Sequence, residues 1–258
     1  MNLATNEIHI WLTPKSRVPA SALAGYYHLM NAAEISRNKR YATQQMRDAD
    51  AVTRALQRTV LSEYENCPPS LWVFSREDGG KPSITSPRTS VCFNLSHTQE
   101  WVVCAVAQSS LVGIDVENCH RKVPVLTLAK RFFSKQEYLE LASLPEKEQK
   151  NRFFDCWTLK ESYIKARGEG VALGLSKFSF DFGANGAISF GCDSELQDDP
   201  AQWRFMLSPH QGDHRMALAI KRPQFGGEIT VCYFLTIPQH SVENYAGPLR
   251  LQSHRELR

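Results

Sequence analysis

The sequence lacks several features that would place it outside the ordinary soluble proteins. It has no uninterrupted apolar run of about 18 residues, so no transmembrane helix is expected. The first residues, MNLATNEIHIWLTP, lack a basic segment followed by an apolar one, so no secretory signal is expected. The formal net charge is only +3, which is too small to argue for a nucleic-acid or membrane partner. There is also no heptad, short solenoid repeat or low-complexity block.

The cysteines lack the arrangement of a disulfide framework or a zinc site. There are seven of them, scattered and odd in number, and no two form a CxxC pair. This pattern favours reduced thiols and a cytoplasmic location. A chain of 258 residues, 42% apolar and 22% charged, is long enough to bury the core of one large domain or two small ones.

Hydrophobic periodicity divides the chain into two runs of helix and strand. NEIHIWLTP predicts a first strand, residues 21–65 look helical, and LWVFSRED predicts a strand. DGGKPSITSPRTS is rich in residues that break regular structure and predicts a loop, whereas VCFNLSH and WVVCAVAQ predict a hairpin.

A second run begins with a strand at SSLVGIDVEN. Residues 123–168 then look mostly helical and end at Gly168 and Gly170. The strands expected after this point are KFSFDFG, AISFG, WRFMLSP, HRMALAIKR and EITVCYFLTI. A polar tail from residue 239 is expected to be loose.

HRMALAI takes a place in the second half like that of WVVCAVA in the first. This indicates a duplicated α+β unit, and a cleft between two such halves is a natural ligand site. We therefore expect an N-terminal half at 1–112, a C-terminal half at 113–238 and a polar tail at 239–258.

Two acids in GIDVE are candidates for metal ligands. Asp115 and Glu117 are spaced i, i+2 in a predicted strand, so their carboxylates face the same way. Two ionised carboxylates side by side repel each other unless a cation lies between them, and oxygen ligands suit Mg²⁺. The alternative is an exposed strand end that carries two solvated acids.

The segment DCWTLKESYIKARGEG supplies a possible third acid. Glu161 and Lys165 are spaced i, i+4 and share a helical face, on which they could form a surface ion pair worth about 0.2–0.5 kcal/mol. If Glu161 instead joins Asp115 and Glu117, Lys165 would lie beside an anion such as a diphosphate bound to the metal. If Glu161 and Lys165 form only a surface ion pair, Trp157 and Ile164 are simply core contacts.

Other polar residues could bind phosphate. Lys81 follows glycines that let the backbone approach a ligand, and His97 at the end of FNLSH could donate to a phosphate. The alternative for His97 is a hydrogen-bonded residue at a hairpin end. Several basic residues between 37 and 58 form either a solvated helical face or a site for a phosphate monoester: Arg37, Lys39, Arg40, Arg47, Arg54 and Arg58.

Taken in order, these motifs resemble those of a known family. They are GKP at 80–82, FNLSH at 93–97, GIDVE at 113–117, FFSKQEY at 132–138 and WTLKESYIKARGEG at 157–170. The sequence resembles the 4′-phosphopantetheinyl transferases, specifically the two-halved, Sfp-like class. The resemblance implies an α+β fold of two similar halves related by pseudo-twofold symmetry, with the active site between them.

The resemblance also implies a reaction. An enzyme of this family moves the phosphopantetheine arm of coenzyme A onto a serine of an acyl or peptidyl carrier protein, with Mg²⁺ as cofactor, and releases adenosine 3′,5′-bisphosphate. It implies Mg²⁺ ligands at Asp115, Glu117 and Glu161, and diphosphate contacts from Lys165 with Lys160 nearby. Contacts to the rest of coenzyme A are implied for Gly80, Lys81 and Pro82 at the adenine end, and for Ser96, His97 and Arg37 near the 3′-phosphate.

Two points of the carried-over site stay open. The general base that deprotonates the serine is Glu137, Glu161 or a metal-bound water. The family often has a basic residue eight or nine positions after a pair like Arg40-Tyr41, whereas this chain has Asp48 and Ala49 there. The adjacent Arg47 is the substitute that we expect to contact the 3′-phosphate.

Carrier proteins of this kind are typically acidic around the modified serine, so basic residues are expected to meet them: Lys130, Arg131, Lys135, Lys165 and Arg167. The alternative is that these residues serve solubility. A monomer is expected, acting in fatty-acid, polyketide or nonribosomal-peptide synthesis. The rival functions are a non-catalytic coenzyme A-binding regulator with the same fold, and a metal-dependent phosphohydrolase.

Overall fold

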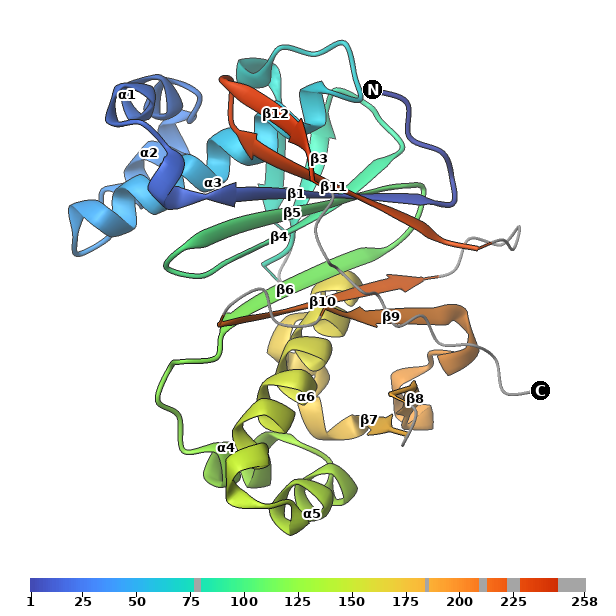
Figure 1. Cartoon of the computed structure of the whole chain (residues 1–258). Helices are drawn as coiled ribbons and strands as arrows, with labels where there is room; N and C mark the ends of the chain where they lie inside the picture. Colours follow the sequence, from blue (N-terminus) through green and yellow to red (C-terminus); the bar gives the residue numbers. More distant parts are fainter. Residues whose placement is uncertain (77–79, 184–185, 209–212, 222–227, 246–258) are drawn as a thin grey trace. The chain divides into compact units, whose positions relative to one another are not determined.

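The computed structural model of the chain describes residues 1–76, 80–183, 186–208, 213–221 and 228–245 (Figure 1). The chain forms two compact units. Of the described residues, unit 1 contains 1–76, 82–109 and 228–245, and unit 2 contains 80–81, 110–183, 186–208 and 213–221. The expected contiguous halves, 1–112 and 113–238, differ from these units, because the segment at 228–245 belongs to unit 1. Within the described residues, no helix is both long and apolar enough to cross a bilayer.

Unit 1 is built on a five-stranded sheet in the order β12-β11-β1-β5-β4. The central strand is β1 (Glu7–Pro14), which pairs antiparallel with β5 (Trp101–Gln108) and parallel with β11 (Thr230–Ile237). Every residue of β1 after Glu7 is buried, which fits a central strand with both faces covered. The predicted hairpin is confirmed, since β4 (Val91–His97) pairs antiparallel with β5.

The C-terminal end of the described chain completes this sheet. Strand β12 (Ser241–Asn244) pairs antiparallel with β11, although the residues from 239 onward were expected to be loose. The part of that expected tail at 246–258 lies outside the described residues. The local sequence did not indicate that β11 would pair with β1, because the paired residues are more than 200 positions apart in the sequence.

The helical region predicted at 21–65 is three helices. They are α1 (Ala20–His28), α2 (Ala32–Asn38) and α3 (Gln44–Ser62). The breaks fall at capping residues: Asn31 and Glu34 form a reciprocal capping box at the start of α2, and the Thr43 side chain caps α3. The buried apolar residues of α3 recur at helical spacing and join the core of unit 1: Ala51, Val52, Ala55, Leu56 and Val60.

A small hairpin completes unit 1. It pairs β2 (Val73–Arg76) with β3 (Pro82–Ser86), although the second segment was predicted to be loop. The short 3-10 helices of the chain are Lys15–Arg17 and Pro69–Leu71 in unit 1, and Gly170–Leu173, Leu175–Lys177, Ser194–Leu196 and Pro200–Gln202 in unit 2.

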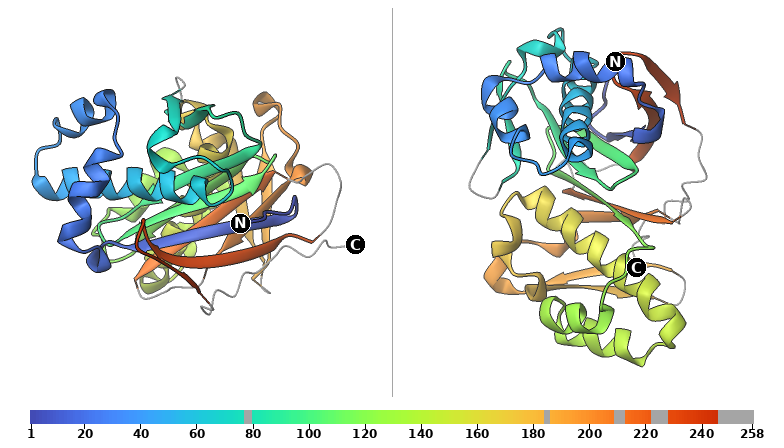
Figure 2. Two further views of the ribbon diagram at one scale, coloured as in Figure 1. Left: turned by 90° about the horizontal axis from the view of Figure 1, so that it is seen from above. Right: turned by 90° about the vertical axis from the view of Figure 1, so that its left-hand side faces the viewer.

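Unit 2 packs the longest helix of the described chain against a three-stranded sheet. The sheet has the order β6-β10-β9, with β6 (Val112–Asn118), β10 (His214–Lys221) and β9 (Trp203–Leu207) all antiparallel to their neighbours. Helix α6 (Glu146–Arg167) lies against β6 and β10 (Figure 2). It ends at Gly168, whose positive φ of 79° is typical of a glycine helix cap, as predicted.

The remaining elements of unit 2 surround α6. They are α4 (Val125–Phe132), α5 (Lys135–Ser143) and the two-stranded sheet of β7 (Phe178–Phe182) and β8 (Ile188–Cys192). Tyr163 of α6 packs among the rings of Phe178, Phe190, Trp203 and Phe205, so an aromatic core fixes the C-terminal part of the helix.

Candidate active site

The candidate active site of unit 2 is formed where β6 meets the last turns of α6. Asp115 on β6 is buried, and its Oδ1 atom lies 2.6 Å from the Nζ atom of Lys165 on α6. Glu117 follows two residues later on β6, and Glu161 precedes Lys165 by one helical turn. The predicted strand and helix therefore bring Asp115 and Lys165 into direct contact.

Glu117 has two partners of its own. The indole Nε1 atom of Trp157, on α6, donates a hydrogen bond of 3.1 Å to its Oε1 atom. A guanidinium nitrogen of Arg121 lies 3.5 Å from its Oε2 atom, but the Arg121 side chain is 53% exposed. Trp157 was expected to be only a core contact. It contacts the candidate site as well, and no sequence signal distinguishes these two roles.

The three carboxylates act on one another electrostatically. Burial raises the pKa of Glu161 to about 7; Asp115 and Glu117 add to this rise, whereas Lys165 opposes it. Burial also raises the pKa of Glu117, and the charge of Asp115 raises it further against the effects of Arg121, Trp157 and Lys165. Ionisation of these two glutamates is thus disfavoured in the absence of a cation, and a cation beside them would favour their ionised forms.

The residues present suit a hard cation in their chemistry but are not arranged as a closed metal site. Within the described ranges, no group of three His, Cys, Asp or Glu side chains is placed so that it could hold a metal ion. Carboxylates such as those of Asp115, Glu117 and Glu161 are nevertheless the oxygen donors that Mg²⁺ prefers, and the charge of Asp115 helps to raise the pKa of both glutamates. The Lys165 ammonium supplies the positive charge next to Asp115 in this arrangement.

Lys160 and Glu137 lie elsewhere, as a buried ion pair. The Nζ atom of Lys160 lies 2.8 Å from Oε2 of Glu137 and also donates to the carbonyl oxygens of Leu175 and Phe178. Both side chains are almost fully excluded from solvent. The expectation that Lys160 contacts a diphosphate is therefore wrong, because Lys160 precedes Glu161 by only one residue and points to another side of the helix.

Glu137 has a structural role in unit 2. Its side chain accepts hydrogen bonds from the backbone N–H groups of Ser134 and Phe180, at 2.9 Å each, besides its contact with Lys160. The first of these bonds belongs to the capping box of α5. With both oxygens engaged and buried, Glu137 is not placed to remove a proton from a serine of another protein, and the prediction that it is the general base is not supported.

Lys81 is held at the end of α6. Its Nζ atom donates to the carbonyl oxygen of Ala166 at 2.9 Å and to that of Val112 at 3.3 Å. A lysine ammonium at the C-terminus of a helix satisfies carbonyl groups that lack helical partners. The preceding Gly80 has a φ of +79°, which a side chain would strain, so the glycine is needed for this path of the backbone.

The other predicted ligand contacts belong to unit 1. Arg37 is on α2, Pro82 begins β3, and Ser96 and His97 end β4, where Ser96 is buried and His97 is exposed. The Arg47 side chain turns back toward the start of its own helix, where it donates to the carbonyl oxygen of Tyr41 at 2.7 Å and to the side chain of Gln44 at 3.1 Å.

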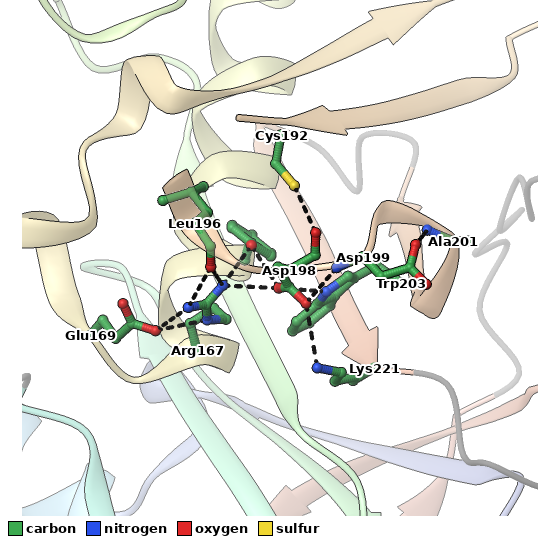
Figure 3. Close-up of polar contacts among 10 residues, drawn as sticks. Arg167, Glu169, Cys192, Leu196, Asp198, Asp199, Ala201, Trp203 and Lys221 are labelled. Carbon is green, nitrogen blue, oxygen red and sulfur yellow. Dashed lines mark hydrogen bonds and ion pairs between the residues drawn. The ribbon is translucent and has the colours of Figure 1, made fainter. Parts of the chain in front are cut away.

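A second polar cluster, which the sequence did not reveal, fixes the last turn of α6 (Figure 3). The Asp198 carboxylate is 3% exposed and accepts hydrogen bonds from the Tyr163 hydroxyl and the Trp203 indole, at 2.8 Å each. It also pairs with Arg167 at 3.0 Å and with Lys221 at 3.4 Å. Burial alone would raise the pKa of Asp198, but these hydrogen bonds and charges outweigh it and leave the pKa lowered.

Comparisons with known proteins give the class of the molecule. Residues 111–219 match a family model described as the 4′-phosphopantetheinyl transferase superfamily, and residues 19–109 match one described as 4′-phosphopantetheinyl transferase, N-terminal. Both matches point to the same class of transferase and together they span most of the chain.

Curated relatives agree with these matches. The 4′-phosphopantetheinyl transferase HetI of Nostoc is 34% identical over segments that cover 67% of this chain and 73% of that protein. The 4′-phosphopantetheinyl transferase Sfp of Bacillus subtilis is 35% identical over 68% of this chain and 75% of that protein. The chain belongs to the 4′-phosphopantetheinyl transferase superfamily and is an enzyme of the Sfp-like kind, as its motifs predicted.

Proposed function

We propose that this transferase moves the phosphopantetheine group of coenzyme A to a serine of an apo acyl or peptidyl carrier protein, with Mg²⁺ held by Asp115, Glu117 and Glu161. The observation that carries the proposal is the 2.6 Å ion pair of Asp115 and Lys165 beside two glutamates, Glu117 and Glu161, whose pKa values are raised by burial and by the charge of Asp115. Bound Mg²⁺ would polarise the diphosphate and offset its charge.

Residues of the chain are proposed to neutralise charge on the diphosphate and to remove the proton of the serine. The reaction joins the serine oxygen to the phosphorus next to pantetheine and breaks the bond from that phosphorus to the oxygen of the leaving adenosine 3′,5′-bisphosphate. Lys165 neutralises diphosphate charge by exchanging its bond to Asp115 for one to the substrate. The Glu137 carboxylate is occupied by Lys160 and by the backbone N–H groups of Ser134 and Phe180, so the candidates for the general base are Glu161 and a metal-bound water.

The contacts proposed for the rest of coenzyme A are Gly80, Lys81 and Pro82 for the adenine end and Arg37, Arg47, Ser96 and His97 for the 3′-phosphate. Lys81 and Arg47 would have to exchange their bonds to backbone carbonyl oxygens for bonds to the ligand. The free thiols of all seven cysteines fit the cytoplasmic location that we propose.

The carrier protein is proposed to dock on the exposed basic residues of α4 and α5. Lys130, Arg131 and Lys135 are exposed there, and Leu139 is 55% exposed beside them. Arg167 is less suited to docking than its charge suggested, because it is paired with Asp198 and Glu169. An acidic carrier surface would complement this patch.

The test is mass spectrometry of several apo carrier proteins after incubation with the enzyme, coenzyme A and Mg²⁺. We expect each competent carrier to gain one phosphopantetheine group, and we expect a chelator to prevent the gain. A coenzyme A-binding regulator would give no gain with any carrier, and a phosphohydrolase would cleave coenzyme A without a carrier. If a carrier gained phosphopantetheine in the presence of a chelator, the proposed metal site would be contradicted, but the proposed transfer reaction would not.

A further inference from the structure

The indole of Trp157 is directly bonded to a proposed metal ligand. Its Nε1 atom lies 3.1 Å from Oε1 of Glu117, within the range of an N–H···O hydrogen bond. The bond joins α6 to β6 across 40 residues of sequence, so it links the two elements that carry the carboxylates.

The donor is held in place by aromatic neighbours. The Trp157 ring is stacked on Phe153 with a centroid distance of 5.7 Å and an interplanar angle of 23°. Phe132, from α4, meets it edge-on at 5.8 Å. An indole fixed on two sides cannot follow a moving carboxylate, so the carboxylate is oriented by the indole.

The other observed partner of Glu117 is a weaker constraint. Arg121 approaches Oε2 only to 3.5 Å and is 53% exposed, so its contribution is that of a surface ion pair. Trp157 is also spaced i, i+4 from Glu161 on α6. One face of this helix therefore carries both the proposed third ligand and the donor that orients the second ligand.

We propose that Trp157 is a positioning residue that holds the Glu117 carboxylate in the orientation in which it binds Mg²⁺. The inference rests on the proposed function, since it takes Glu117 as a metal ligand. Hydrogen-bond partners of metal ligands typically change metal affinity by about 10- to 100-fold when they are removed. Trp157→Phe removes the N–H donor and retains an aromatic ring for the contacts with Phe153 and Phe132.

The experiment measures Mn²⁺ binding to the full chain by electron paramagnetic resonance, with Mg²⁺ as competitor, so that the readout is independent of turnover. We expect Trp157→Phe to raise the dissociation constant about 10- to 100-fold. In the Glu117→Ala background the same change should have no further effect, because both the acceptor and the proposed ligand are absent. Unchanged affinity of a folded Trp157→Phe protein would overturn the inference.

The matched control is Trp203→Phe. Trp203 also donates its indole N–H to a carboxylate, Asp198, at 2.8 Å (Figure 3). None of the described contacts of Trp203 is to one of the three proposed ligands. This variant should lose stability and keep the wild-type Mn²⁺ affinity. Equal losses of affinity in both variants would mean that general loosening of unit 2, and not positioning, explains the effect.

A second measurement decides the matter if Trp157→Phe fails to fold. The indole ¹⁵N resonance of Trp157 in the wild-type protein is assigned by elimination, through Phe variants of the other four tryptophans. We expect that resonance to shift during a Mg²⁺ titration, and its constancy at saturating Mg²⁺ would overturn the inference. Failure of the wild-type protein to bind Mn²⁺ is a different outcome, which would refute the proposed metal site itself.

Discussion

Gly113 on β6 and Ser162 on α6 are in backbone contact. A Cβ atom at position 113 would lie 2.9 Å from the Cα atom of Ala166 and closer still to the carbonyl oxygen of Ser162. The glycine of GIDVE therefore sets how near β6 approaches α6, and with it the 2.6 Å contact between Asp115 and Lys165.

We expect Gly113→Ala to move β6 away from α6, because both clashing partners are backbone atoms that cannot rotate aside. The stability of unit 2 should fall by about 3 kcal/mol, the upper part of the usual range for overpacking, and transfer activity should be lost. Urea denaturation and carrier modification measure the two effects. Gly191→Ala is the control, since a Cβ atom there would lie 3.9 Å from the Ser179 hydroxyl. A wild-type urea midpoint for Gly113→Ala would contradict the argument.

Glu161→Gln should abolish metal-dependent transfer without unfolding the protein. The amide keeps the shape of the side chain and removes one of three mutually repelling charges, so the metal-free protein should be as stable as the wild type or slightly more stable. Removal of a hydrogen-bond partner of a metal ligand typically costs up to about 100-fold in metal affinity or activity. Because Glu161 is proposed to be a ligand itself, we expect its loss to lower the transfer rate by at least about 100-fold. Glu148→Gln, an exposed position on the same helix, should keep full activity. Wild-type turnover of the Glu161 variant would remove this residue from the site.

Lys160→Met should lower the free energy of unfolding. The change leaves the Glu137 carboxylate buried without its cation, which costs about 3–5 kcal/mol. Lys177→Met is the comparison, because the Lys177–Glu195 pair is exposed and should contribute less than about 1 kcal/mol. Thermal unfolding measures both, and activity is normalised to the folded fraction. A Lys160 variant that kept its melting temperature and lost activity would instead support a contact from Lys160 to the diphosphate.

Acid should weaken the cluster around Asp198. The folded-state pKa of Asp198 is lowered from the ordinary 3.8, so the ionised carboxylate stabilises the fold above that pH, and this stabilisation is lost as the pH falls through the lower folded value. Asp198→Asn should cost about 2 kcal/mol at pH 7, as expected for lost hydrogen bonds to a charged group. The difference from the wild type should shrink below about pH 4. A difference that is constant from pH 7 to pH 3 would exclude ionisation as the cause.

Much of the candidate site followed from local rules. The strand at GIDVE, the helix ending at Gly168 and the i, i+4 relation of Glu161 and Lys165 are all properties of short segments. The same helical rule also excludes the carried-over role of Lys160, since consecutive helical residues point about 100° apart. The family resemblance implied a diphosphate contact for Lys160, whereas the structure places Lys160 in the core, paired with Glu137.

Other contacts could not be predicted because they join distant segments without a local pattern. Asp198 lies between two short 3-10 helices, and its partners on α6 and β10 are more than 20 residues away in sequence. The bond from Trp157 to Glu117 depends on how α6 lies on β6, and a tryptophan on the inner face of a helix has the same periodicity whether or not its N–H group has a polar partner. The strand at Pro82–Ser86 was missed because the surrounding Gly, Pro and Ser residues masked its pairing with β2.

The parallel pairing of β1 with β11 has a consequence for biosynthesis. Strand β1 is translated long before its neighbour at Thr230–Ile237, which follows all of the described part of unit 2 that precedes it. Until then the apolar edge of β1 has β5 on one side and an open row of backbone N–H and C=O groups on the other. A nascent chain of this transferase thus exposes an unpaired strand edge for a long interval, and we expect a chain that ends before Thr230 to be prone to aggregation.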